Sequence, residues 1–233
     1  MKSKKLKICY MGDATSPHIA FWAEEFSKLG HEVHVISPYN AQINGALVHS
    51  TKTKYNKFLN FFLTYIILRK LIKKINPDII HAHYLGTFSF LGALTGFRPF
   101  MGTVWGSDVS VFRKKNIFTN YMLNYILKKS DLIEVADITT KNFLIEKYDV
   151  NKKKIDVPYW GVKTEEFKPI KMRKNVEIMY LRKSSDKYST SIFVGALNIV
   201  RKTFPDIIST LKRDKRNSKV ESMIDEYKLE GNI

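Results

Sequence analysis

The sequence predicts an α/β protein with a Rossmann-like parallel sheet, helices on both faces of that sheet, and an incomplete second Rossmann-like domain. Three observations predict this fold class. Short apolar runs alternate with helix-period segments through the first two-thirds of the 233 residues. Glycine or proline ends several of these segments. With 44% hydrophobic residues the chain can bury a sizeable core. Alternating strands and helices form right-handed crossovers, and these give a mainly parallel sheet.

Each element follows from its local pattern. Seven apolar runs are predicted strands: residues 7–12, 31–38, 45–50, 78–84, 100–106, 131–137 and 154–160. Helical patterns lie between most of them, at residues 18–29, about 55–75, 87–96, about 112–129 and 138–148. Gly30 ends the first helical pattern and Pro77 ends the second. Together these elements predict one domain over residues 1–162.

The rest of the chain has a different composition. Residues 163–175 are polar, contain a proline and are interpreted as a linker. A strand (176–182), a helix (about 189–203), a short strand near 206–211 and a last helix (about 217–229) follow. These are about one and a half βα units, so residues 176–233 are interpreted as a partial second domain.

The net charge of +17 is distributed unevenly, because no Asp or Glu occurs from Val33 to Pro77. Within that stretch an apolar run, residues 58–68, is flanked by basic residues, namely Lys57, Arg69, Lys70, Lys73 and Lys74. Three interpretations stay open for this helix: contact with an anionic membrane surface, a solvated basic face, or nucleic-acid binding. No helix-turn-helix, RNP or zinc-finger pattern supports the last, so we expect no nucleic-acid partner.

The apolar run, the N-terminus and the single cysteine indicate in which compartment of the cell the protein is found. The apolar run is shorter than the ~20 residues that a membrane-spanning helix needs, and the N-terminus has no signal-peptide pattern. The single cysteine, Cys9, lies in the first apolar run and is expected in the core, which suits a reducing compartment. We therefore expect a cytoplasmic protein, peripheral to the inner face of the cytoplasmic membrane if the basic helix binds lipid.

Candidate site residues follow the strands, because ligands of an open parallel sheet bind beyond the carboxyl ends of its strands. They are Gly12, Asp13, His18, His83, Tyr84, Trp105, Gly106, Ser107, Asp108, Trp160 and Gly161. Simpler explanations stay open: Gly12 as a tight strand end, His18 as an ordinary early-helix residue, and Asp108 as a helix cap. His81 is expected in the core, and no carboxylate or third histidine is suitably spaced from His81 and His83, so no metal site is predicted.

Five segments resemble family-4 glycosyltransferases in their order along residues 7–230. They are "GDATSPHIAFWAEEFSKLGHEVHVISP", "PDIIHAHYLG", "GTVWGSDV", "SDLIEVAD" and "IDVPYWGVKTEEFKP". They are most similar to members that build lipopolysaccharide and capsular polysaccharide. The resemblance implies the GT-B architecture, in which one Rossmann-like domain mainly holds the acceptor and the other mainly holds a nucleotide-sugar.

The resemblance also implies residue roles. Gly12, Arg182 and Lys187 match positions that approach the donor diphosphate, where paired cations stabilise the leaving group. The acceptor side would include Asp13, His18 and the loop from Trp105 to Asp108. Trp105 stands where the family often has histidine; tryptophan cannot relay a proton but can stack on a sugar ring. No catalytic residue is assigned, and no cofactor is expected besides the nucleotide-sugar co-substrate.

The implied activity is transfer of a hexosyl group, with retention, from a nucleotide-sugar to a lipid-linked or polysaccharide acceptor. The family's Gly-x-Gly loop after "FPDI" is replaced here by "ISTLKRDKRNSK", and the chain ends before the Glu-x7-Glu motif. The alternative is therefore a truncated, non-catalytic protein, or a subunit that binds acceptor or membrane and is completed by a partner chain that supplies the donor domain. An NAD-dependent dehydrogenase is disfavoured, because the first βα turn lacks the G-x-G-x-x-G glycines.

Overall fold

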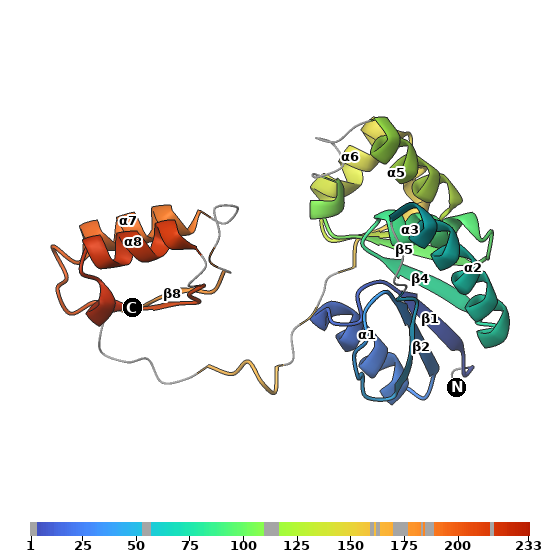
Figure 1. Cartoon of the computed structure of the whole chain (residues 1–233), viewed down its shortest axis with the longest axis horizontal. Helices are drawn as coiled ribbons and strands as arrows, with labels where there is room; N and C mark the ends of the chain where they lie inside the picture. The colour runs from blue at the N-terminus through green and yellow to red at the C-terminus, as the bar shows by residue number, and fades with distance from the viewer. Residues whose placement is uncertain are drawn as a thin grey trace. The chain divides into compact units, whose positions relative to one another are not determined.

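The structure is a computed structural model that describes residues 4–52, 57–109, 117–158, 161, 164–169, 177–182, 184, 189–214 and 217–233. The chain divides into two compact units, Met1–Gly161 and Val162–Ile233, which are described separately (Figure 1).

The first unit is built on a seven-stranded parallel sheet with the order β3-β2-β1-β4-β5-β6-β7. The strands are β1 (Lys7–Met11), β2 (Glu32–Ser37), β3 (Ala46–Ser50), β4 (Ile79–His83), β5 (Phe100–Val104), β6 (Leu132–Val135) and β7 (Ile155–Asp156). Every pairing is parallel, with Ile8 opposite both Val33 and Ile79, for example. The strand order reverses between the adjacent β1 and β4, which is where an open α/β sheet forms a ligand crevice. The predicted fold class is confirmed.

Helices cover both faces of this sheet (Figure 1). They are α1 (Pro17–Lys28), α2 (Lys57–Ile75), α3 (Thr87–Leu94), α5 (Ile117–Lys129) and α6 (Ile138–Tyr148). The connection through α1 runs toward one edge of the sheet and the others run toward the opposite edge. Right-handed crossovers therefore place α1 on one face and α2, α3, α5 and α6 on the other. Local signals fix the helix ends: Ser16 caps α1, Asp137 caps α6, and Asn76–Pro77 follows α2.

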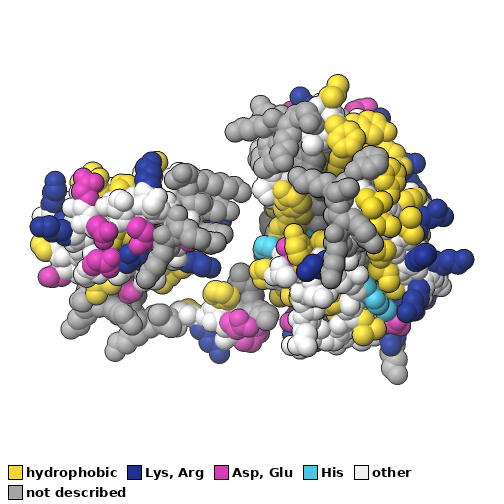
Figure 2. Space-filling model, in the orientation of Figure 1, with side chains coloured by type: hydrophobic (Ala, Val, Ile, Leu, Met, Phe, Trp, Pro, Cys, Tyr) yellow, Lys and Arg dark blue, Asp and Glu magenta, His cyan; other side chains and the backbone are white. Residues whose placement is uncertain are grey.

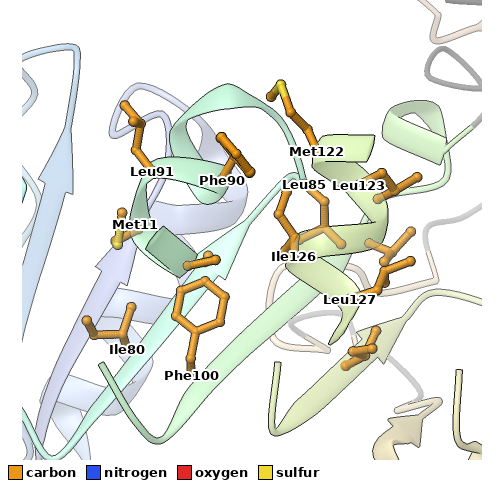
Figure 3. Packing of buried hydrophobic residues seen from close by; sticks show 14 of the residues in the cluster. Met11, Ile80, Leu85, Phe90, Leu91, Phe100, Met122, Leu123, Ile126 and Leu127 are labelled. Carbon is orange, nitrogen blue, oxygen red and sulfur yellow. The ribbon is translucent and has the colours of Figure 1, made fainter. Parts of the chain in front are cut away.

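The larger core lies between the sheet and α2, α3 and α5 (Figure 3). Its fully buried members include Met11 and Phe100 from the sheet and Leu123 and Ile126 from α5. A second cluster, with Tyr10 and Ile19, lies under α1 on the opposite face. Cys9 is buried as predicted, and burial raises the pKa of its thiol to about 12.

The second unit contains a two-stranded parallel sheet, β8 (Glu177–Tyr180) and β9 (Ile208–Leu211), with helices α7 (Thr190–Val200) and α8 (Ser218–Glu226). Val194, Leu197, Val220 and Ile224 form its core with Ile207 and Leu229. Arg213 joins its parts through hydrogen-bonded ion pairs with Glu221 and Glu230. These elements follow the predicted order of strand, helix, strand, helix.

Several element ends differ from prediction. Of the strand expected over 154–160, the described residues up to 158 form only Ile155–Asp156, because Pro158 follows closely and has no N–H for the ladder. Residues 159 and 160 lie outside the described residues. The helix expected over 112–129 is described from Ile117 onward, and its first part lies outside the described residues. The last helix ends at Glu226 rather than about 229, and Lys228 has a left-handed φ of 53°.

Candidate functional site

Three aromatic side chains from different segments meet at the carboxyl edge of the sheet. His18 lies at the start of α1, His83 is the last residue of β4, and Trp105 directly follows β5. The Trp105 ring lies 4.1 Å from the His18 ring and 5.9 Å from the His83 ring, measured between centroids. His18 is exposed, Trp105 is half-buried and His83 is buried. The structure therefore brings together three residues that the sequence placed at the site only separately.

Asp108 connects two loops of this edge. Its buried carboxylate accepts hydrogen bonds from the backbone N–H of Leu85 (3.0 Å), Trp105 (3.1 Å) and Val109 (3.0 Å). Burial raises the pKa of the Asp108 carboxyl, and the backbone donors oppose that rise. The carboxylate therefore orients the Trp105 backbone through a hydrogen bond. Its bond to the loop after β4 could not be read from the sequence. The predicted contact of Asp108 with a ligand stays a prediction.

Gly12 is required here by packing. A Cβ built at this position would lie 2.5 Å from Cδ1 of Ile19 and 3.2 Å from the carbonyl oxygen of His83. The Gly12 N–H donates to the Ile36 carbonyl at 3.2 Å, which continues the pairing of β1 with β2. The absent side chain therefore lets α1 approach the end of β4. The expected approach of this amide to a diphosphate stays a prediction.

The loop from Asp13 to Ser16 prepares the start of α1. The exposed Asp13 carboxylate accepts hydrogen bonds from the N–H (2.9 Å) and the hydroxyl (2.6 Å) of Thr15. The Ser37 hydroxyl, at the end of β2, accepts from the Ala14 N–H at 3.0 Å. This anchoring sets where the helix begins, and hence where His18 stands beside Trp105.

Behind the aromatic group lies a buried polar cluster that sequence reasoning missed. His81 Nε2 and the Thr103 hydroxyl are 2.6 Å apart, and that hydroxyl donates to Glu134 at 2.7 Å. Glu134 also lies 3.5 Å from His81 Nε2. The carboxylate is 53 residues from His81 in sequence and reaches it only because β4, β5 and β6 are adjacent strands. His81 is in the core, as predicted.

His83 stands beside this cluster. Both of its ring nitrogens are buried, and neither has a hydrogen-bond partner among the residues that the structure describes. The rings of Tyr10, Trp22, His81 and Trp105 surround it at centroid distances of 4.3 to 6.2 Å. Burial, together with the neighbouring His81 and His18, lowers the pKa of His83 well below its usual range. His83 is therefore a neutral imidazole that lies under Trp105.

Tyr84 has a strained backbone next to these groups. Its φ is 65°, which is uncommon outside glycine, and its side chain is exposed. Hydrogen bonds hold this geometry: its N–H donates to the Thr103 carbonyl (3.1 Å), and its own carbonyl accepts from the Ser89 hydroxyl (2.8 Å). The Ser107 side chain hydrogen-bonds to the Tyr84 phenol. Strained residues of this kind cluster at functional sites.

The other predicted residues are distributed as follows. Gly106 has a left-handed φ of 77° and follows Trp105 directly. Arg69, Lys70, Lys73 and Lys74 are exposed on α2, and Arg182 is exposed in the second unit. Lys187, Trp160 and the side chain of Lys57 lie outside the described residues. No group of three His, Cys, Asp or Glu side chains that could hold a metal ion occurs in the part of the chain that the structure describes.

The first unit is a Rossmann-like sheet whose aromatic and polar side chains gather at the switch point, which is where proteins with open α/β sheets generally bind their ligands. Residues 7–137 match the family model described as glycosyl transferase 4-like. The chain belongs to this family. A search of curated proteins finds no match.

Solved structures share the fold at low identity. A glycosyltransferase from Rickettsia africae aligns with a TM-score of 0.69 and 19% identity, over 99% of this chain and 67% of that one. Anabaena Alr3699/HepE in complex with UDP-glucose aligns with a TM-score of 0.71 and 12% identity, over 97% of this chain and 67% of that one. UDP-GlcNAc 2-epimerase from Methanocaldococcus jannaschii aligns with a TM-score of 0.61 and 12% identity, over 96% and 69%. At these identities the likeness shows the fold alone.

Proposed function

We propose that the chain is a nucleotide-sugar-dependent hexosyltransferase that acts with retention in the synthesis of a cell-surface polysaccharide, of the lipopolysaccharide or capsule type. The observation that carries the proposal is the family match over residues 7–137, which include the whole aromatic edge. Its acceptor is a lipid-linked or growing saccharide at the inner face of the cytoplasmic membrane. A nucleotide-sugar serves as co-substrate, and no metal is required.

The acceptor side of the proposal rests on Trp105 and its neighbours. The half-buried Trp105 ring, which lies against the His18 ring at an interplanar angle of 37°, offers an aromatic face at the sheet edge. Aromatic faces pack well against the apolar face of a sugar ring. Asp108 fixes the Trp105 backbone, so this face is held in place before ligand arrives. The exposed Tyr84 and the half-buried Ser107 supply hydroxyl groups beside it.

The donor side rests on the second unit. The HepE structure contains UDP-glucose, which supports a uridine diphosphate sugar as the donor class. We assign the diphosphate to Arg182 and Lys187, because two cations stabilise the charge that develops on a leaving diphosphate. Substituting both by alanine should abolish transfer. Lys202→Ala, an exposed cation of the same unit, should leave it unchanged.

The test incubates the full chain with a panel of UDP-sugars, with and without lipid-linked saccharide acceptors, and analyses the products. Acceptor-dependent release of UDP with a new glycosidic linkage supports the proposal. Interconversion of UDP-sugars without acceptor would indicate an epimerase, a class of enzyme that shares this fold. That result would overturn the proposal of a transferase. Absence of UDP binding in calorimetry would instead favour a non-catalytic acceptor-binding protein.

A further inference from the structure

Two helices of the first unit expose apolar side chains and basic side chains on the same outward face. On α2 the exposed apolar residues are Leu59, Phe62 and Ile66, and the exposed basic residues further along the helix are Arg69, Lys70, Lys73 and Lys74. On α5 the corresponding residues are Ile117, Phe118 and Tyr121, followed by Lys128 and Lys129. Ile117 is 89% exposed, and Phe62 and Tyr121 are 49% and 60% exposed. We refer to these residues together as the α2–α5 face.

The spacing of these residues gives one stripe on each helix. On α2, positions 59, 62, 66, 70 and 73 recur every three or four residues. On α5, positions 117 and 121 are four residues apart, and position 128 follows two turns later on the same side. The opposite side of α2 carries Leu68, Ile72 and Ile75, which are buried against the sheet. The exposed apolar residues are therefore in excess of what the core requires.

The two stripes lie on one continuous surface. Aromatic rings link the helices through α3: Phe61 on α2 contacts Phe90 on α3 at 6.5 Å, and Phe90 contacts Tyr125 on α5 at 5.4 Å. Figure 2 shows hydrophobic side chains gathered over α5, α3 and α2, with Lys and Arg side chains along the margin beside α2. The described residues of this surface combine exposed apolar side chains with a basic margin. Exposed apolar patches with a polar rim mark interaction sites.

The positive charge of the α2–α5 face favours an anionic bilayer as its partner. Neither α2, α3 nor α5 contains a single Asp or Glu. A second copy of the chain seated here would bring like charges together, whereas anionic lipid headgroups complement the lysines while the acyl region accepts the aromatic and aliphatic side chains. Tyrosine at the margin of such a patch suits the interface between headgroups and acyl chains.

The direction of the helices relates this face to the candidate site. Each helix follows the carboxyl end of a strand, so the apolar halves of α2 and α5 start from the edge of the sheet that carries Trp105 and His18. We propose that the α2–α5 face docks on an anionic bilayer, with its apolar half inserted beside the candidate site and its lysines on the headgroups. This docking would present a lipid-linked acceptor to Trp105. Only this presentation of the acceptor, and not the docking itself, rests on the proposed function.

The test measures flotation of the full chain with vesicles of phosphatidylcholine alone and of phosphatidylcholine with phosphatidylglycerol. We expect binding to the anionic vesicles that weakens with salt. Phe62→Ser with Tyr121→Ser should reduce the partition coefficient about tenfold through lost apolar insertion. Lys70→Glu with Lys73→Glu should reduce it at least as much. Phe118→Trp should be quenched by brominated lipid, which reports insertion directly.

Matched controls use other faces of the same unit. Leu29→Ser removes a side chain that is 68% exposed at the end of α1, and Lys152→Glu with Lys153→Glu reverses two exposed charges elsewhere. Both should change the partition coefficient less than twofold. Equal losses in the controls would overturn the proposal, as would concentration-dependent dimerisation abolished by Phe62→Ser, or binding to RNA in preference to vesicles. UDP binding, measured separately, tests the proposed function. The docking proposal and the proposed function can therefore fail independently of each other.

Discussion

The Asp108 carboxylate accepts a hydrogen bond from the Leu85 backbone N–H at 3.0 Å and thereby ties the loop after β5 to the loop after β4. The same carboxylate accepts from the Trp105 N–H at 3.1 Å. One buried side chain thus sets the backbone of the residue that we propose stacks on the acceptor.

Asp108→Asn tests this connection. The amide group of asparagine cannot accept from all the amides that the two carboxylate oxygens serve, and its NH2 group leaves at least one buried donor unpaired. We expect the free energy of unfolding to fall by about 3 kcal/mol, measured by urea denaturation. Asp13→Asn keeps a side-chain oxygen that can accept the exposed bonds from Thr15, and it should change the free energy of unfolding by less than about 1 kcal/mol. Equal effects of the two substitutions would contradict the buried role.

Gly12→Ala tests the close approach of α1 to β4. The new Cβ would overlap Cδ1 of Ile19, so we expect the free energy of unfolding to fall by about 1–3 kcal/mol. Ile19→Val removes the overlapping carbon, and the double variant should recover part of the loss. A double-mutant cycle measures this coupling. Strictly additive losses would show that the His83 carbonyl or another group, and not Ile19, sets the requirement for glycine.

His83→Phe tests the unpartnered imidazole. In the folded chain the pKa of His83 is held well below its ordinary value of 6.5, while the unfolded chain binds a proton near that value. The contribution of His83 to stability is therefore complete above about pH 6.5 and is lost as the pH falls below it, by up to about 1.4 kcal/mol per pH unit.

Phenylalanine keeps a ring among Tyr10, Trp22 and Trp105 and removes the buried nitrogens that lack partners. We expect His83→Phe to be neutral or stabilising at pH 7.5, and its advantage over the wild type to grow by up to about 2 kcal/mol at pH 5. Urea denaturation at both pH values measures it. An unchanged pH dependence, or a large loss of stability at pH 7.5, would show that the folded chain pairs or protonates His83.

Trp105→Ala tests the aromatic face proposed for the acceptor. Loss of the ring should raise the KM for the saccharide acceptor about tenfold, with a smaller change in kcat, because stacking binds substrate and transition state alike. Trp105→Phe keeps a ring on the same backbone and should retain most of the affinity. If kcat falls instead while the KM stays constant, Trp105 acts on the transition state and not on acceptor binding.

Much of the fold was predictable because its signals are local. Apolar runs such as residues 78–84 and 131–137, helix stops such as Gly30 and Pro77, and the alternation of the two periods predict the elements and the parallel sheet. The carboxyl-edge rule then identified Trp105 and His18 as candidates, because it depends only on strand direction.

The sequence alone determined the fold class, the family resemblance and the basic character of α2. Tertiary structure alone decided which side chains meet: Glu134 reaches His81 through Thr103, Asp108 serves amides of two loops, and His83 is enclosed under Trp105. It also decided that Leu59, Phe62 and Ile66 of α2 are exposed, as are Ile117, Phe118 and Tyr121 of α5. Periodicity reports which residues share a face of one element, whereas packing between elements distant in sequence decides whether that face is covered.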